Sequence, residues 1–244
     1  MRYKGVFITG TDTGVGKSVA AACIIRALLR KGVKVGAMKP IETGCENIYG
    51  RLMPLDGTLL RTMAEMDDPV DLIVPARFAY PLAPLVAAEL EDRTVDLDAI
   101  MNAYTTLSKK YEFLVVEGAG GLLVPITKRQ GARGEGQEVY FMEDLIKDLQ
   151  LPVVIVARAT LGTINHTLLT VDHAASAGLN VIGVIINHSS PSRNNDAERT
   201  TPVVLKELCP VPVLGVLPYL DSIAPGTIDE LTYIIGSTLV DLLF

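Results

Sequence analysis

Short runs of apolar residues, rich in valine and isoleucine, recur along the chain and are bounded by turn or loop residues. The runs are continuous rather than alternating with polar residues, which is typical of strands buried on both faces of a mostly parallel sheet. The sequence therefore predicts strands at residues 5–9, 33–38, 113–116, 153–157, 181–186 and 213–217.

Longer segments with apolar residues at helical spacing lie between these runs. The first holds alanine and leucine inside, Arg30 near its end and Gly32 beyond it as a stop signal. The predicted helices are 17–30, 55–66, 97–109, 143–149, 164–177, one that ends near residue 208 and one that begins at about residue 228. Pro202 predicts a late start or a kink in the penultimate helix. Alternating strands and helices predict an α/β fold, a doubly wound and mostly parallel sheet with helices on both faces.

Two polar segments interrupt this pattern. Residues 128–138, KRQGARGEGQE, carry three glycines, many charges and no aliphatic side chain larger than alanine. Residues 189–195 are similarly polar. We interpret both segments as insertions or mobile loops. No linker is strong enough to divide the chain, so we expect a single domain over residues 1–244.

Composition and charge narrow the class of protein. Of 244 residues, 49% are hydrophobic, which excludes a disordered chain. With 22 Lys and Arg against 28 Asp and Glu, the net charge of −6 argues against broad binding of nucleic acid or anionic membranes. The three cysteines have no metal-site or disulfide-framework spacing, which favours a reducing compartment. The apolar run at residues 6–8 is too short for a signal peptide, and no apolar stretch approaches the length of a membrane span, so we expect a soluble cytoplasmic protein.

The most informative segment is residues 10–18, GTDTGVGKS, which follows the first predicted strand and precedes the first predicted helix. A glycine-rich turn at such a junction points backbone N–H groups at a phosphate, and the helix N-terminus adds partial positive charge. Lys17 would reach the β- and γ-phosphate oxygens, and the Ser18 hydroxyl would bind Mg²⁺. The strict motif has four residues between its glycines, whereas five separate Gly10 from Gly16. An ordinary strand–helix turn is the alternative, but the context favours binding of a nucleoside triphosphate and a P-loop nucleotide hydrolase-like fold.

Other candidate residues stand at the ends of later strands, where ligands bind in open α/β sheets. Glu117 ends an apolar strand before a glycine-rich turn and is a candidate Mg²⁺ ligand, although such a carboxylate by itself is common on surfaces. Lys39 follows the second strand and would place a second cation over a transferred phosphoryl group, although a lone lysine is usually solvated. Asp56, near a helix start, is equally well a Mg²⁺ ligand or a capping carboxylate.

Five motifs follow one another over nearly the whole chain: GTDTGVGKS, MKPIETG, VVEGAGGLLVP, ATLGTINHTLLT and IINH. In this order and spacing they resemble the dethiobiotin synthetase family, the ligases of biotin biosynthesis. The five-residue glycine spacing is itself what that family shows.

The resemblance implies an ATP- and Mg²⁺-dependent cyclo-ligase. Such an enzyme closes a cyclic urea from 7,8-diaminopelargonate, CO₂ and ATP, and it releases dethiobiotin, ADP and phosphate. One amine takes up CO₂ as a carbamate, the carbamate oxygen attacks the γ-phosphate, and the second amine closes the ring on the mixed anhydride. The resemblance also implies a homodimer whose substrate site is completed by the other subunit.

By the same resemblance, individual residues take roles. Lys17 and Lys39 are the catalytic cations, and the magnesium ligands are Ser18, Asp56 and Glu117. The nucleotide-binding residues are Thr13, Gly14, Val15, Gly16, Lys17, Ser18, Asp56, Glu117, Gly118, Ala119, Gly120, Asn187, Leu217, Pro218 and Tyr219, with Asn187 reading adenine. The substrate-binding residues are Thr43, Gly120, Gly121, Leu161, Gly162, Thr163 and Asn165. The last four lie at a helix N-terminus, whose free N–H groups suit a carboxylate, while Thr163 or Asn165 is also a candidate helix cap.

Gly14 departs from the family pattern, because several members have an acidic residue there. After Pro218 we expect an acidic residue to contact the nucleotide, and Asp221 and Glu230 are both candidates. The main alternative function is that of a ParA/MinD-like regulatory ATPase. That group carries a signature lysine five positions before the phosphate-loop lysine, where this chain has Asp12. The chain also has no Lys or Arg after Lys206, whereas membrane-docking members end in a basic amphipathic helix.

Overall fold

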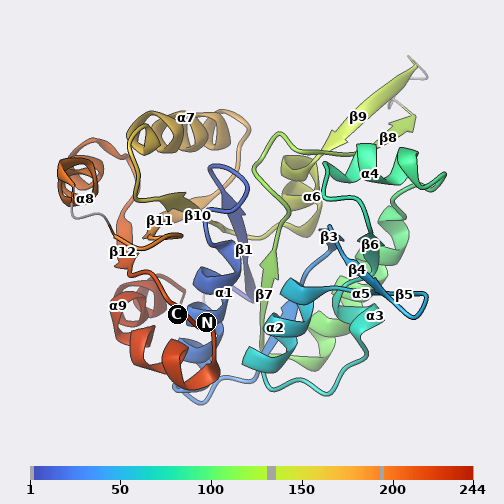
Figure 1. The fold of residues 1–244 in the computed structure, drawn as a ribbon, viewed down its shortest axis with the longest axis horizontal. Helices are drawn as coiled ribbons and strands as arrows, with labels where there is room; N and C mark the ends of the chain where they lie inside the picture. The colour runs from blue at the N-terminus through green and yellow to red at the C-terminus, as the bar shows by residue number, and fades with distance from the viewer. Residues whose placement is uncertain (1–2, 131–135, 193–194, 244) are drawn as a thin grey trace.

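A computed structural model describes residues 3–130, 136–192 and 195–243. Its centre is a sheet of six strands in the order β12-β11-β10-β1-β7-β2, and every neighbouring pair is parallel (Figure 1). The strands are β1 (Gly5–Gly10), β2 (Val35–Met38), β7 (Phe113–Glu117), β10 (Val153–Arg158), β11 (Val181–Asn187) and β12 (Val213–Leu217). All six predicted strands are therefore confirmed, with boundaries that shift by at most two residues.

Helices cover both faces of the sheet, which confirms the doubly wound α/β fold (Figure 1). On one face α1 (Lys17–Leu29) lies between α2 (Leu55–Met63) and α9 (Pro225–Leu243). The other face carries α5 (Leu97–Lys110), α6 (Met142–Leu149), α7 (Thr163–Ser176) and α8 (Asp196–Leu208). Within the described ranges, no helix is long and apolar enough to cross a membrane.

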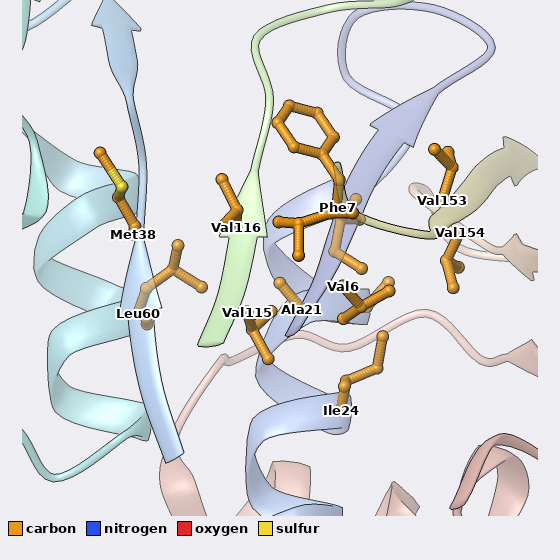
Figure 2. Close-up of a cluster of buried hydrophobic side chains, with 14 of the residues drawn as sticks. Val6, Phe7, Ala21, Ile24, Met38, Leu60, Val115, Val116, Val153 and Val154 are labelled. Atoms are coloured by element: carbon orange, nitrogen blue, oxygen red, sulfur yellow. The ribbon is translucent and has the colours of Figure 1, made fainter. Parts of the chain in front are cut away.

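The core runs through the middle of the sheet, because β1 is buried along its whole length. Val6 faces α1, where it lies near Ala21 and Ile24 (Figure 2). Phe7 takes the opposite face and packs beside Gly118 and Met142. Burial on both faces explains why these strands are continuous apolar runs in the sequence.

Several short elements lie outside the central sheet and were not predicted. Two three-residue strands, β3 (Ile41–Thr43) and β6 (Ala76–Phe78), pair in parallel, and β3 carries the chain on from Lys39 toward α2. The remaining elements are β4 (Glu46–Ile48), β5 (Arg51–Met53), α3 (Val70–Ile73), α4 (Pro84–Leu90), β8 (Pro125–Gln130) and β9 (Gln137–Phe141).

The prediction of a loop over residues 128–138 is wrong at both of its ends. Residues 128–130 belong to β8 and residues 137–138 to β9, and the two strands pair antiparallel as an arm that leaves the body of the molecule (Figure 1). A two-stranded hairpin outside the central sheet can form from polar and charged residues without large apolar ones. The charged sequence of residues 128–138 is therefore typical of a loop as well as of such a hairpin. Residues 131–135, and residues 193–194 of the second polar segment, lie outside the described ranges.

The predicted late start at Pro202 is also wrong. Helix α8 begins six residues earlier, and Pro202 lies inside it. Asn195 caps this start, because its side-chain oxygen accepts a hydrogen bond from the Glu198 N–H at 3.0 Å. The cap, rather than the proline, therefore sets the beginning of the helix.

Candidate active site

The glycine-rich loop lies between β1 and α1, as the sequence predicts. At its end Gly16 has φ +94°, a left-handed conformation that favours glycine. A Cβ there would lie 2.0 Å from Nδ2 of Asn187, the last residue of β11. That same Nδ2 donates a hydrogen bond to the Val15 carbonyl at 3.0 Å. The end of β11 therefore holds the glycine-rich loop in place, and only glycine at position 16 leaves room for the Asn187 side chain.

The two residues after this turn begin α1. Lys17 is 7% exposed, and it makes no ion pair with any side chain in the described part of the chain. Burial and the nearby charge of Lys39 lower the pKa of Lys17, because both disfavour a second ammonium group there. The Ser18 hydroxyl donates to Glu117 Oε1 at 3.0 Å, so this side chain already faces the end of β7.

Lys39, the residue after β2, is the central cation of the site. Its Nζ donates to Glu117 Oε1 at 2.5 Å, to Asp56 Oδ2 at 3.1 Å and to the Gly118 carbonyl at 3.3 Å. Burial by itself lowers the pKa of Lys39, but the two carboxylates outweigh burial and raise it above its ordinary value. The ammonium group is therefore charged at neutral pH.

Glu117 is fully buried, and its Oε2 has no hydrogen-bond partner among the described residues. Burial raises the pKa of this carboxyl group, and the Lys39 ammonium opposes that shift. Ser18, Asp56 and Glu117 together offer hydroxyl and carboxylate oxygens, the hard donors that Mg²⁺ prefers. No group of three or more His, Cys, Asp or Glu side chains in these ranges forms a metal cage. A partial set of this kind fits Mg²⁺, which usually keeps several waters and binds phosphate oxygens as well.

Asp56 is not a helix cap, so that alternative is wrong. The N-cap of α2 is Pro54, and Asp56 lies in the first turn with its carboxylate toward Lys39. Burial by itself raises the pKa of Asp56, but Lys39 outweighs it and holds the pKa below its ordinary value. The cap comes instead from Glu42 in β3, whose oxygens accept from the N–H groups of Asp56 and Gly57, each at 2.9 Å.

A cavity of about 500 Å³ joins these groups at the carboxyl edge of the sheet. The predicted residues that line it are Thr13, Gly14, Gly16, Lys17, Ser18, Lys39, Thr43, Asp56, Glu117, Ala119, Gly120, Asn187, Pro218 and Tyr219. Residues that complete the wall and were not predicted are Val19, Ile41, Glu42, Leu59, His188, Ser189, Leu220 and Ile223. Of the other predicted residues, Val15 and Leu217 are buried beneath the surface, and Gly118 contributes its carbonyl to Lys39.

Asn187 and Tyr219 line the same cavity as two apolar residues, Leu220 and Ile223. The Asn187 Oδ1 atom is buried and has no partner within the described ranges, so an acceptor is available there. Neither Asp221 nor Glu230 lines the cavity.

The four predicted residues at the start of α7 do not line this cavity. The N-cap is Gly162, with φ +91° and no side-chain hydrogen bond, so the alternative of Thr163 or Asn165 as the cap is wrong. Thr163 is buried, whereas Leu161 is 89% exposed. The predicted residue Gly121 lies in a second cavity of about 480 Å³ on the other side of the glycine-rich loop.

Arg158 is a further residue that the sequence interpretation missed. It ends β10, and its guanidinium group pairs with the Asp12 carboxylate, which also accepts from the Thr13 N–H at 2.7 Å. Ligands bind at the carboxyl ends of strands in such sheets, so the position of Arg158 at the end of β10 makes it a candidate site residue in the sequence as well.

The parallel sheet, the loop before α1 and the buried cations define a P-loop nucleotide-binding protein. MinD from Pyrococcus horikoshii in complex with Mg-ADP has the same fold, with a TM-score of 0.54, 16% identity and coverage of 98% of both chains. A ParA family ATPase from Chlorobium tepidum matches with a TM-score of 0.50, 16% identity and coverage of 99% of this chain and 95% of that chain. A family model described as an AAA domain matches residues 4–227.

Sequence relatives identify the family within this class. ATP-dependent dethiobiotin synthetase BioD of Thermodesulfovibrio yellowstonii is 54% identical over 93% of both chains. The enzymes of the same name from Methanocaldococcus jannaschii and Bacillus subtilis are 46% and 40% identical, over 75% and 92% of this chain and 78% and 91% of theirs. This chain belongs to the dethiobiotin synthetase family.

Proposed function

We propose that this protein makes dethiobiotin from 7,8-diaminopelargonate, CO₂ and ATP. One amine of the diamine adds to CO₂ and loses a proton, which gives a carbamate. A carbamate oxygen attacks the γ-phosphate, and ADP leaves. The second amine then attacks the carbamoyl carbon, phosphate leaves and the cyclic urea closes.

The observation that carries this proposal is the pair of buried cations at one end of the cavity. Lys17 forms no ion pair in the described part of the chain, and Lys39 is held between two carboxylates. A phosphoryl group transferred between two oxygens carries charge that such fixed cations stabilise without reorganisation. Lys17 would hold the γ-phosphate, and Lys39 would neutralise both this group and the carbamate.

The rest of the cavity has the donors that a nucleotide requires. The residues at 13–18 and the turn 118–120 would hold the phosphates and the adjoining ribose, because backbone N–H groups of a glycine-rich loop bind anions. Asn187 would read adenine, with its free Oδ1 accepting from the exocyclic amine. Pro218, Tyr219 and the underlying Leu217 would form the base-side wall. Ser18, Asp56 and Glu117 would hold Mg²⁺, which would neutralise charge on the β- and γ-phosphate oxygens.

The diamine would lie beside Thr43 and Gly120, which line the first cavity, rather than beside Gly121, and its carboxylate would meet the start of α7 of a second copy of the chain. Large apolar side chains are exposed around this helix, with Leu161 89%, Leu169 61% and Leu123 56% accessible. Such a concentration of exposed leucine is typical of an interface, so we propose a homodimer. We also propose a cytoplasmic location, because Cys23, Cys45 and Cys209 are free thiols.

The experiment is an assay of ADP release and dethiobiotin formation with ATP, bicarbonate and the diamine. We expect both products in equal amounts, and ADP release that depends on the diamine. A ParA/MinD-like switch would instead hydrolyse ATP without the diamine and respond to DNA or lipid vesicles. Asp12 disfavours that alternative, because it carries a negative charge and already pairs with Arg158.

A further inference from the structure

Glu42 is a buried carboxylate at the edge of the cavity, and the roles proposed above do not use it. It is 6% exposed and belongs to β3. Its Oε1 accepts from the Asp56 N–H and its Oε2 from the Gly57 N–H, both at 2.9 Å. Both oxygens are therefore committed to the first turn of α2.

The first turn of α2 depends on this carboxylate. A helix start leaves N–H groups without partners, and Pro54 at the N-cap makes no side-chain hydrogen bond to them. Glu42 supplies both the missing acceptors and a negative charge at the positive end of the helix. Gly57 also leaves room for Val74, because a Cβ on Gly57 would lie 2.0 Å from Val74 Cγ2, whereas Glu42 Oε2 would lie at an ordinary contact distance of 3.4 Å.

Asp56 is thereby held at two points. Its backbone N–H is bound to Glu42, and its carboxylate accepts from Lys39 Nζ at 3.1 Å. The side chain is 43% exposed, so packing alone does not fix it. The hydrogen bond from the Asp56 N–H to Glu42 fixes the backbone of Asp56, and with it the position from which the Asp56 carboxylate enters the cavity.

We propose that Glu42 is a positioning residue that holds Asp56 in place for Mg²⁺ and for Lys39. This inference rests on the proposed function, in which Asp56 is a magnesium ligand. Groups that orient a metal ligand commonly affect metal affinity by about 10–100-fold when they are removed.

The chemistry of the contact allows a sharp substitution. Glutamine has the volume of glutamate, but its amide presents one acceptor and one N–H₂ group. In Glu42→Gln the N–H₂ group would face a backbone N–H, so one of the two bonds is lost and the remaining polar contact is repulsive. Glu46→Gln in β4 is the matched control, because Glu46 is exposed and lies four residues away on the same segment.

The test measures the dissociation constant of Mn²⁺ from the complex with ADP, by electron paramagnetic resonance, and the Mg²⁺ concentration that half-activates ATP turnover. For Glu42→Gln we expect both to rise by about tenfold or more, and turnover to recover at saturating Mg²⁺. Glu46→Gln should match the wild type. Unchanged Mn²⁺ affinity in folded Glu42→Gln would overturn the proposal. If that variant does not fold, Glu42→Asp carries the same test, because it keeps the charge and withdraws the carboxylate by one methylene.

A double-mutant cycle with Asp56→Asn separates this proposal from the proposed function. If Glu42 acts through Asp56, Glu42→Gln should add little further loss of Mn²⁺ affinity in the Asp56→Asn background. Additive losses would overturn the positioning role while leaving Asp56 a ligand. Unchanged Mn²⁺ affinity in Asp56→Asn alone would overturn the assignment of Asp56 as a ligand, and the role of Glu42 with it. Dethiobiotin formation by the wild type tests the enzyme's activity independently of either result.

Discussion

Lys39 is a buried ammonium group shared by two carboxylates, Glu117 and Asp56. Its pKa is raised, so it keeps its charge, while Lys17 beside it has a lowered pKa and forms no ion pair within the described part of the chain. The two lysines therefore differ in their surroundings, because two carboxylates hold Lys39 and none of the described side chains is paired with Lys17.

We expect Lys17→Ala and Lys39→Ala each to abolish dethiobiotin formation, with a loss of about 10³-fold or more, while the fold is retained. The reason is that each removes a fixed cation from the transferred phosphoryl group, and such groups stabilise the transition state strongly. The measurement is product formation alongside far-ultraviolet circular dichroism. Lys34→Ala is the control, since this lysine is exposed. Near-normal turnover in folded Lys39→Ala would show that the strand end is wrongly assigned.

At the residue scale, the sequence predicts those groups whose place follows from a strand end. Lys39, Glu117 and Asn187 each stand at such an end and line one cavity. The sequence does not single out Glu42, because its partners are backbone N–H groups 14 and 15 residues later, and no side-chain pattern marks such a contact. The sequence leaves two roles for Asp56, magnesium ligand and helix cap, because only the position of Lys39 in the fold distinguishes them.

At the scale of elements, the glycine-rich loop is shaped by strands that come much later in the chain. Asn187 of β11 bonds to Val15, and Arg158 of β10 pairs with Asp12. The loop therefore arrives at its conformation through tertiary contacts as well as through its glycines.

We expect Gly16→Ala to be far more damaging than Gly14→Ala. Both glycines have positive φ, +94° and +72°, so alanine at either costs about 1–2 kcal/mol of backbone strain. At Gly16 the added Cβ would also lie 2.0 Å from Asn187, whereas at Gly14 nothing lies within 4 Å. Overpacking of this kind adds about 1–3 kcal/mol. The measurement is the free energy of unfolding in urea together with ATP binding by calorimetry, and equal losses of stability in the two variants would contradict the steric argument.

Long and strongly patterned elements were predicted well, and short ones were not. Five of the six central strands are buried almost throughout, and only the edge strand β12 is partly exposed, so their apolar runs are evident. Strands β3, β4, β5 and β6 have only three residues each, too few for a pattern. They pair only with each other, β3 with β6 and β4 with β5, outside the central sheet.

At the scale of the whole molecule, the two ends of the chain are joined by ion pairs. Arg26 of α1 donates from Nε and an Nη to the two carboxylate oxygens of Asp229 in α9, at 2.7 Å and 2.8 Å. A third bond, at 2.6 Å, reaches Glu65 just beyond α2. The segment before α9 supplies Tyr219 and Ile223 to the cavity wall, so this clamp of Arg26, Asp229 and Glu65 helps to hold that wall in place.

The clamp predicts a pH-dependent loss of stability in Asp229→Asn. The hydrogen bonds from Arg26 hold the pKa of Asp229 below its ordinary value. A lowered pKa in the folded state gives stability that is present above about pH 4 and is lost as the pH falls through the folded value. We expect Asp229→Asn to be less stable than the wild type by about 1 kcal/mol at pH 7, and by much less at pH 2 to 3. Urea unfolding at both pH values measures the difference in the free energy of unfolding between Asp229→Asn and the wild type. Asp221→Asn is the control, because Asp221 is exposed. A stability difference that persists unchanged in acid would contradict the prediction.

The strand order is a property of the whole molecule that local patterns do not contain. Strand β1 lies between β7 and β10, which come more than a hundred residues later. The sequence predicts that the strands are parallel and buried, but the order follows from which helices pack together. The homodimer proposed above would be a further step of the same kind, because it would depend on faces such as that around Leu161 and Leu169, which are exposed in one chain.

A shared substrate site predicts that two inactive variants restore activity when mixed. Lys39→Ala removes a cation from the subunit that binds ATP. Asn165→Asp places a negative charge at the exposed start of α7, where it would repel the substrate carboxylate but suit the helix terminus. In a mixed dimer, one of the two sites would combine the intact Lys39 of one subunit with the intact Asn165 of the other.

After unfolding and joint refolding of equal amounts, random pairing gives half mixed dimers with one good site each. We therefore expect about a quarter of the wild-type activity, measured at subsaturating diamine. Each variant refolded alone is the control. If every site were built from a single chain, no mixture would exceed the average of its two components, and the α7 residues would have no part in the site of a neighbouring subunit.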